Sequence, residues 1–346
     1  MKKTRNQQPI FMGGGKKIVF MILIVMFLCC LLFDLFQDAL TINSLFSVRM
    51  MMLVILSLFP AYFLVDRLRG DESNLKKIIT LSIWMQIVLF FIMYFSSEAK
   101  YTIYTTFGMG DSVNLTEQNI VTRGFGLSSE INFMTPFLMV FITFFILKNK
   151  YLLLFMVSVT QIVNSNMTAI AILLAAFFSK INIPAKLLFS ILLVVVLFVF
   201  GPIYSPRFYD EFVISGGMRT VDALIKNHFF AVDDINWFTL LFGFQQNISS
   251  SIPDLDIYSD VGWVIMFNYG GGVFITLFIL LLLSLSISAF GKTKLAAIWF
   301  LVGLVFNTKG LLLGVNGYMF ITFIYIFLRN YKNSNEFVKQ VRYRSI

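Results

Sequence analysis

Charged residues (Asp, Glu, Lys and Arg) make up only 13% of this sequence, and several of them stand directly beside apolar segments. The stretch IYSDVGWVIMFNYGGG (257–272) places Asp260 immediately before a long apolar run. A carboxylate in this position either caps a helix or accepts a proton from a hydroxyl group. Glu130 borders another apolar run beside Asn132. Lys309 interrupts the last apolar stretch, where a lysine faces a polar cavity or extends to the membrane interface.

A second group of candidates lies on an amphipathic helix that we expect over Met218–Phe229. Its polar face carries Arg219, Asp222 and Lys226, which follow one another at helical spacing, and apolar residues occupy the opposite face. Such a helix lies on the membrane surface or over a cavity, or it is an ordinary surface helix with solvated charges. His228, the one histidine of the chain, stands near its end.

Each of the other basic candidates also has a structural interpretation. Arg219 is placed to form a salt bridge with Asp222 on its own helix. Arg123, near the end of a long polar stretch, is suited to anchoring a loop at lipid headgroups. His228 is equally typical of a surface histidine. These alternatives remain open from the residues alone.

The elements that must position these residues are membrane helices. The chain has 346 residues and is 58% hydrophobic, whereas soluble domains average about 45–50% apolar residues. The apolar residues fall in runs of roughly 15–25, the length that crosses a hydrocarbon core of about 30 Å. We therefore predict an all-α polytopic integral membrane protein. The two cysteines, Cys29 and Cys30, are adjacent, so they indicate neither a disulfide framework nor a metal site.

We expect about ten transmembrane helices in a single transmembrane domain. No small-x-small cleavage site follows the first apolar run, so no cleavable signal peptide is expected. The ten apolar segments are 18–36, 46–65, 78–95, 132–147, 151–164, 167–179, 187–203, 261–285, 295–307 and 311–328.

The charges orient these segments. With the N-terminus inside, 20 of the 27 basic residues fall in inside segments, including a basic cytoplasmic tail over 329–346, while 14 of the 18 acidic residues fall outside. Both termini are then cytoplasmic. The two long loops, 96–131 and 204–260, face outward, and loops of this length tend to be functional. The positive net charge describes orientation, so a nucleic-acid partner is not indicated.

Three motifs stand in a fixed order along the chain: TRGFGLSSEIN (122–132), NSNMTAIAILLA (164–175), and MRTVDALIKN followed by LLFGFQ and YSDVGWVIMFNYGG (218–271). Together they resemble the O-antigen polymerase (Wzy) family, within the O-antigen polymerase and ligase superfamily of membrane glycosyltransferases. The resemblance covers roughly residues 120–330 and the general plan of ten or more helices.

The resemblance implies a polymerase that joins undecaprenyl-diphosphate-linked oligosaccharide repeat units at the periplasmic face of the bacterial inner membrane. It implies no nucleotide sugar, no metal and no cofactor. Besides the lipid-linked substrate and the bilayer, it implies a membrane partner that regulates chain length. The superfamily also contains O-antigen ligases, which transfer the polymer to a lipid A-core acceptor.

The resemblance also assigns roles to residues. Arg123 and Arg219 match the two arginines that bind and stabilise the departing diphosphate, and Lys309, Glu130 and His228 are further candidates for binding the substrate. Asp260 stands where ligases carry a histidine thought to act as the base, and this departure favours a polymerase over a ligase. Phe244-Gln245 replaces an expected glycine, and neither Arg123 nor Arg219 begins the Arg-x10-Gly pattern of some polymerases. Both departures leave the sugar specificity open.

A transporter or flippase for lipid-linked oligosaccharides is the alternative from a different class. It would need titratable groups in the middle of several membrane segments. The apolar segments are nearly free of Asp and Glu, and the acids gather in the outer loops. This distribution favours chemistry at the outer face.

Overall fold

The computed structural model describes residues 14–37, 45–106, 134–148, 150–164, 167–178, 182–204, 209, 214, 236–248, 259, 261–308 and 310–344. Every regular element among these residues is a helix. Four helical stretches are long and apolar enough to cross a membrane, namely Lys17–Asp34, Phe46–Arg67, Glu72–Phe95 and Gly262–Phe290. The prediction of an all-α membrane protein is confirmed at this level, and the number of ten crossings stays a prediction.

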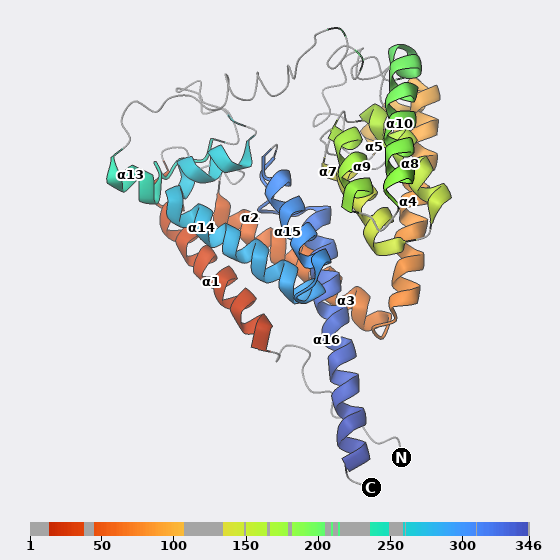
Figure 1. Ribbon diagram of the computed structural model, residues 1–346. Coiled ribbons are helices and arrows are strands. Elements are labelled where there is room, and N and C mark those ends of the chain that lie inside the picture. The colour runs from red at the N-terminus through yellow and green to blue at the C-terminus, as the bar shows by residue number, and fades with distance from the viewer. Residues whose placement is uncertain are drawn as a thin grey trace. The chain divides into compact units, whose positions relative to one another are not determined.

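Each of the ten expected segments corresponds to helical structure (Figure 1). In chain order these are α1 (Gly14–Asp34), α2 (Phe46–Leu53) with η1 (Val54–Leu58) and α3 (Phe59–Arg67), α4 (Glu72–Phe95), α7 (Met134–Phe141) with η2 (Ile142–Leu147), α8 (Tyr151–Asn164), α9 (Met167–Phe178), α10 (Ile183–Tyr204), α14 (Gly262–Phe290), α15 (Lys294–Phe306) and α16 (Gly317–Arg344). Two further helices lie in the expected long loops, α5 (Ser97–Thr106) and α13 (Trp237–Phe242).

The second membrane stretch contains a short π-helical section, and a proline explains its position. Pro60 lacks a backbone N–H, and its ring clashes with the carbonyl of the residue four positions earlier in an α-helix. The wider turns of η1 immediately precede Pro60. They take up this misfit, so the helical stretch continues from Phe46 to Arg67 without a break.

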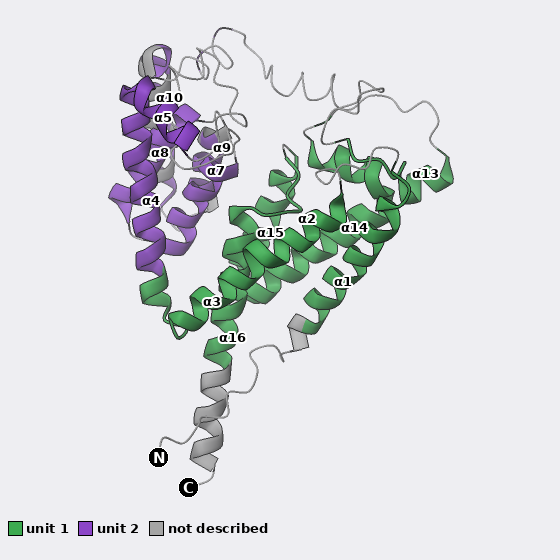
Figure 2. Ribbon diagram, turned by 180° about the vertical axis from the view of Figure 1, so that it is seen from behind, with its two compact units in different colours: residues 1–75, 224–346 green, residues 76–223 purple. Residues whose placement is uncertain are grey.

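The chain divides into two units, one formed by residues 1–75 and 224–346 and the other by residues 76–223 (Figure 2). In the second unit, α7 packs against α8 and α9. The α8–α9 connection is held by buried polar groups: Asn164 Nδ2 donates to Gln161 Oε1 at 3.2 Å, and the Thr168 hydroxyl donates to the Gln161 carbonyl at 3.0 Å. These bonds occur at the NSNMT motif, where polar residues separate two short apolar segments.

In the first unit, α14 is the central helix and packs against α1, α13, α15 and α16 (Figure 1). Its buried face carries large apolar residues at helical spacing, namely Phe274, Phe278, Leu281, Leu282 and Leu285. The adjoining pair α15 and α16 is joined by Trp299, whose ring stacks on Tyr318 with centroids 4.9 Å apart and whose indole N–H donates to the Thr322 hydroxyl at 2.8 Å.

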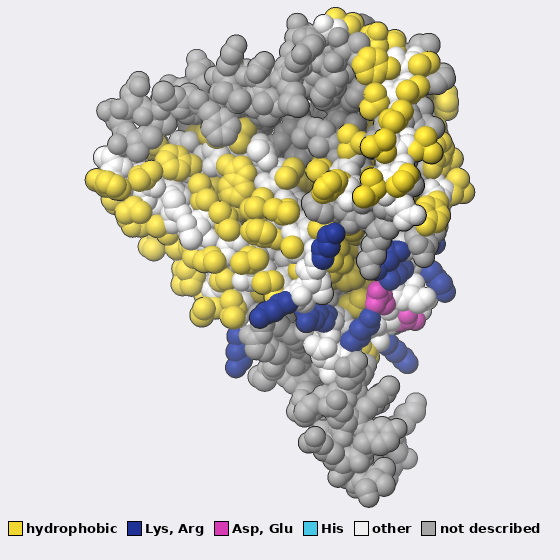
Figure 3. All heavy atoms as spheres, in the orientation of Figure 1, with side chains coloured by type: hydrophobic (Ala, Val, Ile, Leu, Met, Phe, Trp, Pro, Cys, Tyr) yellow, Lys and Arg dark blue, Asp and Glu magenta, His cyan; other side chains and the backbone are white. Residues whose placement is uncertain are grey.

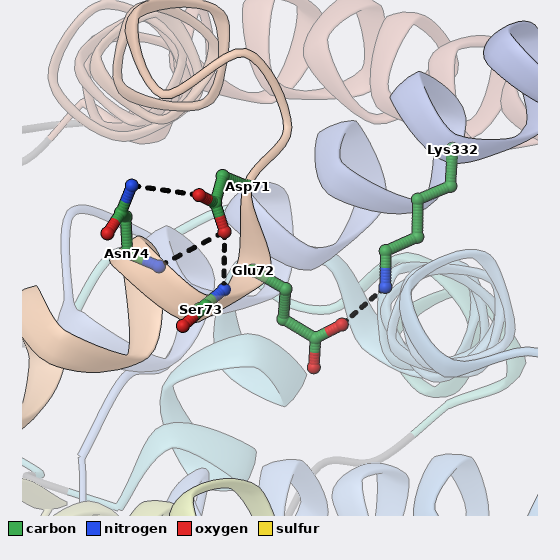
Figure 4. Close-up of polar contacts among 5 residues, drawn as sticks. All are labelled: Asp71, Glu72, Ser73, Asn74 and Lys332. Atoms are coloured by element: carbon green, nitrogen blue, oxygen red, sulfur yellow. Dashed lines mark hydrogen bonds and ion pairs between the residues drawn. The ribbon is translucent and has the colours of Figure 1, made fainter.

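Charged residues gather at one end of this unit. Asp71 accepts hydrogen bonds from the backbone N–H groups of Ser73 and Asn74 at the start of α4, and Glu72 forms an ion pair with Lys332 of α16 (Figure 4). Arg329 donates to the Ile287 carbonyl at 2.9 Å and so satisfies the last turn of α14. The charge count predicts that these segments lie on one side of the membrane. The hydrogen bonds and the ion pair just described bring the segments together.

The space-filling view shows the same separation: hydrophobic side chains cover α1 and α14, and Lys and Arg side chains gather toward the charged end (Figure 3). The exposed basic residues of the first unit include Lys17, Arg67, Arg69, Lys292, Lys294, Arg329 and Lys332.

At the opposite end of the unit, the buried carboxylate of Asp34 ties three helices together. It accepts hydrogen bonds from the Tyr269 hydroxyl at 2.7 Å and from the backbone N–H groups of Phe46 and Ser47 at 3.2 and 2.9 Å. Phe46 also stacks on Tyr269 with ring centroids 4.0 Å apart. Asp34 of α1 therefore caps the first turn of α2 and fixes both helices to α14.

A break divides α14 into two parts. Gly270 and Gly271 have non-helical dihedral angles, with φ +60° at Gly271. The segment after α13 docks at this break, where the Phe244 N–H donates to the Asn268 carbonyl at 2.7 Å. A Cβ atom on Gly271 would lie 2.5 Å from the Gly243 nitrogen, and one on Gly243 would lie 2.7 Å from the Gly271 nitrogen. Only glycine permits both this φ and this approach of two backbones.

We predict that Gly271→Ala lowers the free energy of unfolding by about 1–3 kcal/mol, because the added methyl group has no space and the φ value is strained for alanine. Thermal unfolding of the purified protein in detergent measures the change. Gly310→Ala is the matched control, because a Cβ atom there meets no other atom within 4 Å. Equal stability of the two variants would contradict the close packing at the break.

Candidate functional site

The six predicted site residues lie outside the residues that the structure describes: Arg123, Glu130, Arg219, His228, Asp260 and Lys309. The expected amphipathic helix over Met218–Phe229 lies outside them as well. The roles of these residues therefore stay predictions. Described residues on both sides of Asp260 and of Lys309 do show how the chain is built around these two positions.

The described residues on either side of Asp260, Ser259 and Val261, are buried and form hydrogen bonds through their N–H groups. The Ser259 N–H donates to the Ile248 carbonyl at 2.9 Å, and the Ser259 hydroxyl accepts from the Val261 N–H at 3.1 Å. Neither Ser259 nor Val261 is exposed. The N-cap position of α14 falls on Val261, so Asp260 precedes the cap by one residue.

The turn between α15 and α16 packs against this start of α14. The Asn307 side chain is fully buried and accepts from the Leu312 N–H at 3.0 Å, and the Asn307 carbonyl accepts from the Trp263 N–H at 3.2 Å. A Cβ atom on Gly262 would lie 2.5 Å from both the Asn307 Oδ1 and the Gly310 carbonyl oxygen. Thus the residues that flank Lys309 touch the residue two positions after Asp260.

We call this arrangement the α14 N-terminal cluster and define it by Asn247, Ile248, Ser259, Val261, Gly262, Asn307 and Leu312. Polar and apolar residues are both nearly or fully buried in it, with Asn247 and Ile248 only 3% and 2% exposed. A rigid, satisfied backbone of this kind can hold neighbouring functional side chains in fixed positions.

The electrostatics of the cluster limit how it can bind an anion. A free helix N-terminus attracts anions through its unpaired N–H groups. In α14 the Trp263 N–H is already bonded to the Asn307 carbonyl. This N–H group is therefore not available to a bound anion. Among the described residues, no group of three or more His, Cys, Asp or Glu side chains is arranged to hold a metal ion.

Among the described residues, two charged side chains are buried, Asp34 and Lys100, and the sequence predicted no role for either. Asp34 is engaged by three helices, as described above, so its position is structural. Lys100 of α5 has a fully buried side chain, and burial lowers the pKa of its amine to about 8. The sequence contains a weak signal for the burial of Lys100. Lys100 and Tyr104 are four residues apart, so they lie on one face of α5, and both are buried.

The comparisons with known proteins give no relative. No protein-family model matches the chain, and neither a curated protein nor a solved structure matches it. The resemblance of the motifs to the polymerase family therefore rests on the sequence itself.

We predict that Asn307→Ala lowers the free energy of unfolding by about 1–3 kcal/mol, because the buried Leu312 N–H loses its acceptor. Thr308→Ala is the control, since the Thr308 side chain is exposed and its hydroxyl bonds to carbonyl groups of its own helix. Chemical denaturation in a fixed detergent measures both variants. If Asn307→Ala unfolds at the denaturant concentration of the control, the turn is not held by this side chain.

We also predict a pH dependence from Lys100. Below pH 8 its amine is charged in both the folded and the unfolded chain, so Lys100 adds no pH dependence to the free energy of unfolding there. Between pH 8 and about 10.4, the pKa of an exposed lysine, mainly the unfolded chain binds the proton. The free energy of unfolding therefore rises with pH across this window.

Thermal unfolding at several pH values from 7 to 10 measures this slope. Lys100→Met should flatten it, whereas Lys292→Met, which replaces an exposed lysine outside α5, should leave it unchanged. The same slope in the wild type and in Lys100→Met would contradict the prediction.

Proposed function

We propose that this protein is a membrane glycosyltransferase that joins undecaprenyl-diphosphate-linked oligosaccharide repeat units at the outer face of a bacterial inner membrane. The observation that supports this proposal most directly is the α14 N-terminal cluster. It packs the start of α14 against the turn that contains Lys309, and both segments belong to the region that resembles the polymerase family. The motif order and the outward placement of both long loops, from the charge count, support the proposal further.

The reaction requires a base and a site for the leaving diphosphate. In our proposal Asp260 takes the proton from the acceptor sugar hydroxyl while the hydroxyl oxygen forms a bond to the anomeric carbon of the donor. The bond from this carbon to the diphosphate oxygen breaks at the same time. Arg123 and Arg219 stabilise the charge on the departing diphosphate, because a guanidinium group pairs with two phosphate oxygens.

The proposal gives these groups different roles. In our proposal the diphosphate is bound by the arginines and by Lys309, because their positive charges pair with phosphate oxygens. An aspartate one residue before the helix cap lies close to the membrane boundary, where a lipid-linked sugar is presented. The chemistry then needs neither a nucleotide sugar nor a metal.

The test is a reaction with purified components. The purified protein is placed in phospholipid vesicles with lipid-linked oligosaccharides extracted from the bacterium that naturally contains the protein. The products are then separated by size. We expect joined repeat units, and we expect Arg219→Ala to lower the rate by about 10²–10³-fold, as for loss of one charge-stabilising donor. Asp260→Asn should insert normally and make no polymer.

Arg207→Ala is the matched control, because it removes another arginine of the second long loop that has no proposed role. Its rate should equal that of the wild type. Absence of any joined product from intact substrate would refute the polymerase. Product that forms only with a lipid A-core acceptor would identify a ligase, and movement of the substrate across the bilayer without product would identify a flippase.

A further inference from the structure

The short helix α13 exposes an unusual amount of apolar surface. Trp237, Phe238 and Leu241 are 81%, 61% and 46% exposed, and Leu240 is 40% exposed. None of its six residues is buried. Contact of such a surface with water is unfavourable. Contiguous exposed apolar patches therefore generally mark a site that binds a protein, a ligand or a membrane.

Two backbone N–H groups at the start of α13 are paired internally. The Asn236 side chain accepts from the Thr239 N–H at 2.8 Å, and the Thr239 hydroxyl accepts from the Asn236 N–H at 2.9 Å. This reciprocal capping box pairs two N–H groups that would otherwise need water. A helix end that is satisfied in this way can lie against hydrocarbon.

The docking point of α13 fixes its depth. Its last turn touches Gly271, next to Gly270, whose Cβ atom would lie 2.9 Å from the Phe33 ring. The preceding residue, Tyr269, bonds to Asp34. Phe33 and Asp34 end the apolar stretch Lys17–Asp34, which is long enough to cross a membrane. Therefore α13 is docked level with the end of a membrane-length helix, at the boundary between hydrocarbon and headgroups.

A groove of about 610 Å³ lies between α13 and the second part of α14. Its walls include Leu240 and Leu241 from α13 and Val273, Ile275 and Leu277 from α14. Its one hydroxyl group, on Thr276, donates to the Gly272 carbonyl at 2.7 Å. The groove thus offers no free side-chain donor to water, a sugar or a phosphate, and it suits a hydrocarbon chain.

We propose that α13 is an interfacial membrane helix and that the groove beneath it holds one hydrocarbon chain of a bilayer lipid. The membrane level of the docking point, the apolar lining and the internal bonding of the groove's one hydroxyl group all favour this occupant. The segment 236–248 is then part of the membrane domain, although the sequence places it within the long outer loop 204–260.

The depth of α13 is tested by spin labels on single cysteines in a Cys29→Ala/Cys30→Ala background in phospholipid vesicles. Labels go on Leu241→Cys and Thr276→Cys at the groove, on Leu280→Cys as a lipid-facing reference, and on Lys292→Cys as an exposed polar reference. We expect both groove labels to be accessible to oxygen, as at position 280, and shielded from a water-soluble nickel complex. Access to nickel like that at position 292 would overturn the proposal.

The occupant is tested with a phosphatidylcholine that carries a diazirine in one acyl chain. Illumination should cross-link it to the peptide that contains residues 273–277, and Val273→Phe should lower this yield several-fold by filling the groove. Leu280→Phe, on the same helix outside the groove, should leave it unchanged. Equal yields in the two variants, or disulfide-linked dimers of Leu241→Cys in place of lipid cross-links, would overturn the proposal.

Discussion

The first unit of this protein depends on the contact between two backbones at Gly243 and Gly271. Since neither residue has a side chain, the segment after α13 can lie directly on the break in α14 and bond to the carbonyl of Asn268. The break lets α14 serve two purposes, because the part after Gly271 packs in the helical core while the part before it reaches the α14 N-terminal cluster. Any larger residue at either position would push the two elements apart.

The second organising feature is that the two ends of the unit use different kinds of polar contact. At one end, an ion pair joins α4 to α16, a hydrogen bond joins Arg329 of α16 to α14, and exposed lysines and arginines lie at the same end (Figure 3). At the other end the polar contacts are buried and mostly uncharged, with Asp34 as the one buried carboxylate described there. Charged side chains lie where water can solvate them. Where the chain is buried, the hydrogen bonds are made mostly by backbone and amide groups, because burying a charge costs more. The proposed chemistry and the proposed lipid groove both belong to the second end.

Much of the fold follows from hydrophobic pattern. The expected segment 151–164 coincides with α8, and 261–285 lies within α14, because apolar runs bounded by polar residues leave a helix little choice of position in a membrane. The boundaries differ where tertiary contacts take over. The last helix begins at Gly317 and not at 311, since Asn307 draws the intervening turn onto α14 and Asn316 caps the first turn of α16. The candidate site is a different matter, because its six residues lie outside the described part of the chain and rest on sequence position and motif resemblance.

The sequence by itself determined the all-helical membrane class and the ten apolar segments, since these depend on local composition and periodicity. Only the tertiary structure decided that Asp34 would cap α2, that Lys100 would be buried, and that α13 would dock at a break in α14. These features join residues far apart in the chain. They depend on which backbones can approach and which polar groups lose water, and no local pattern records either.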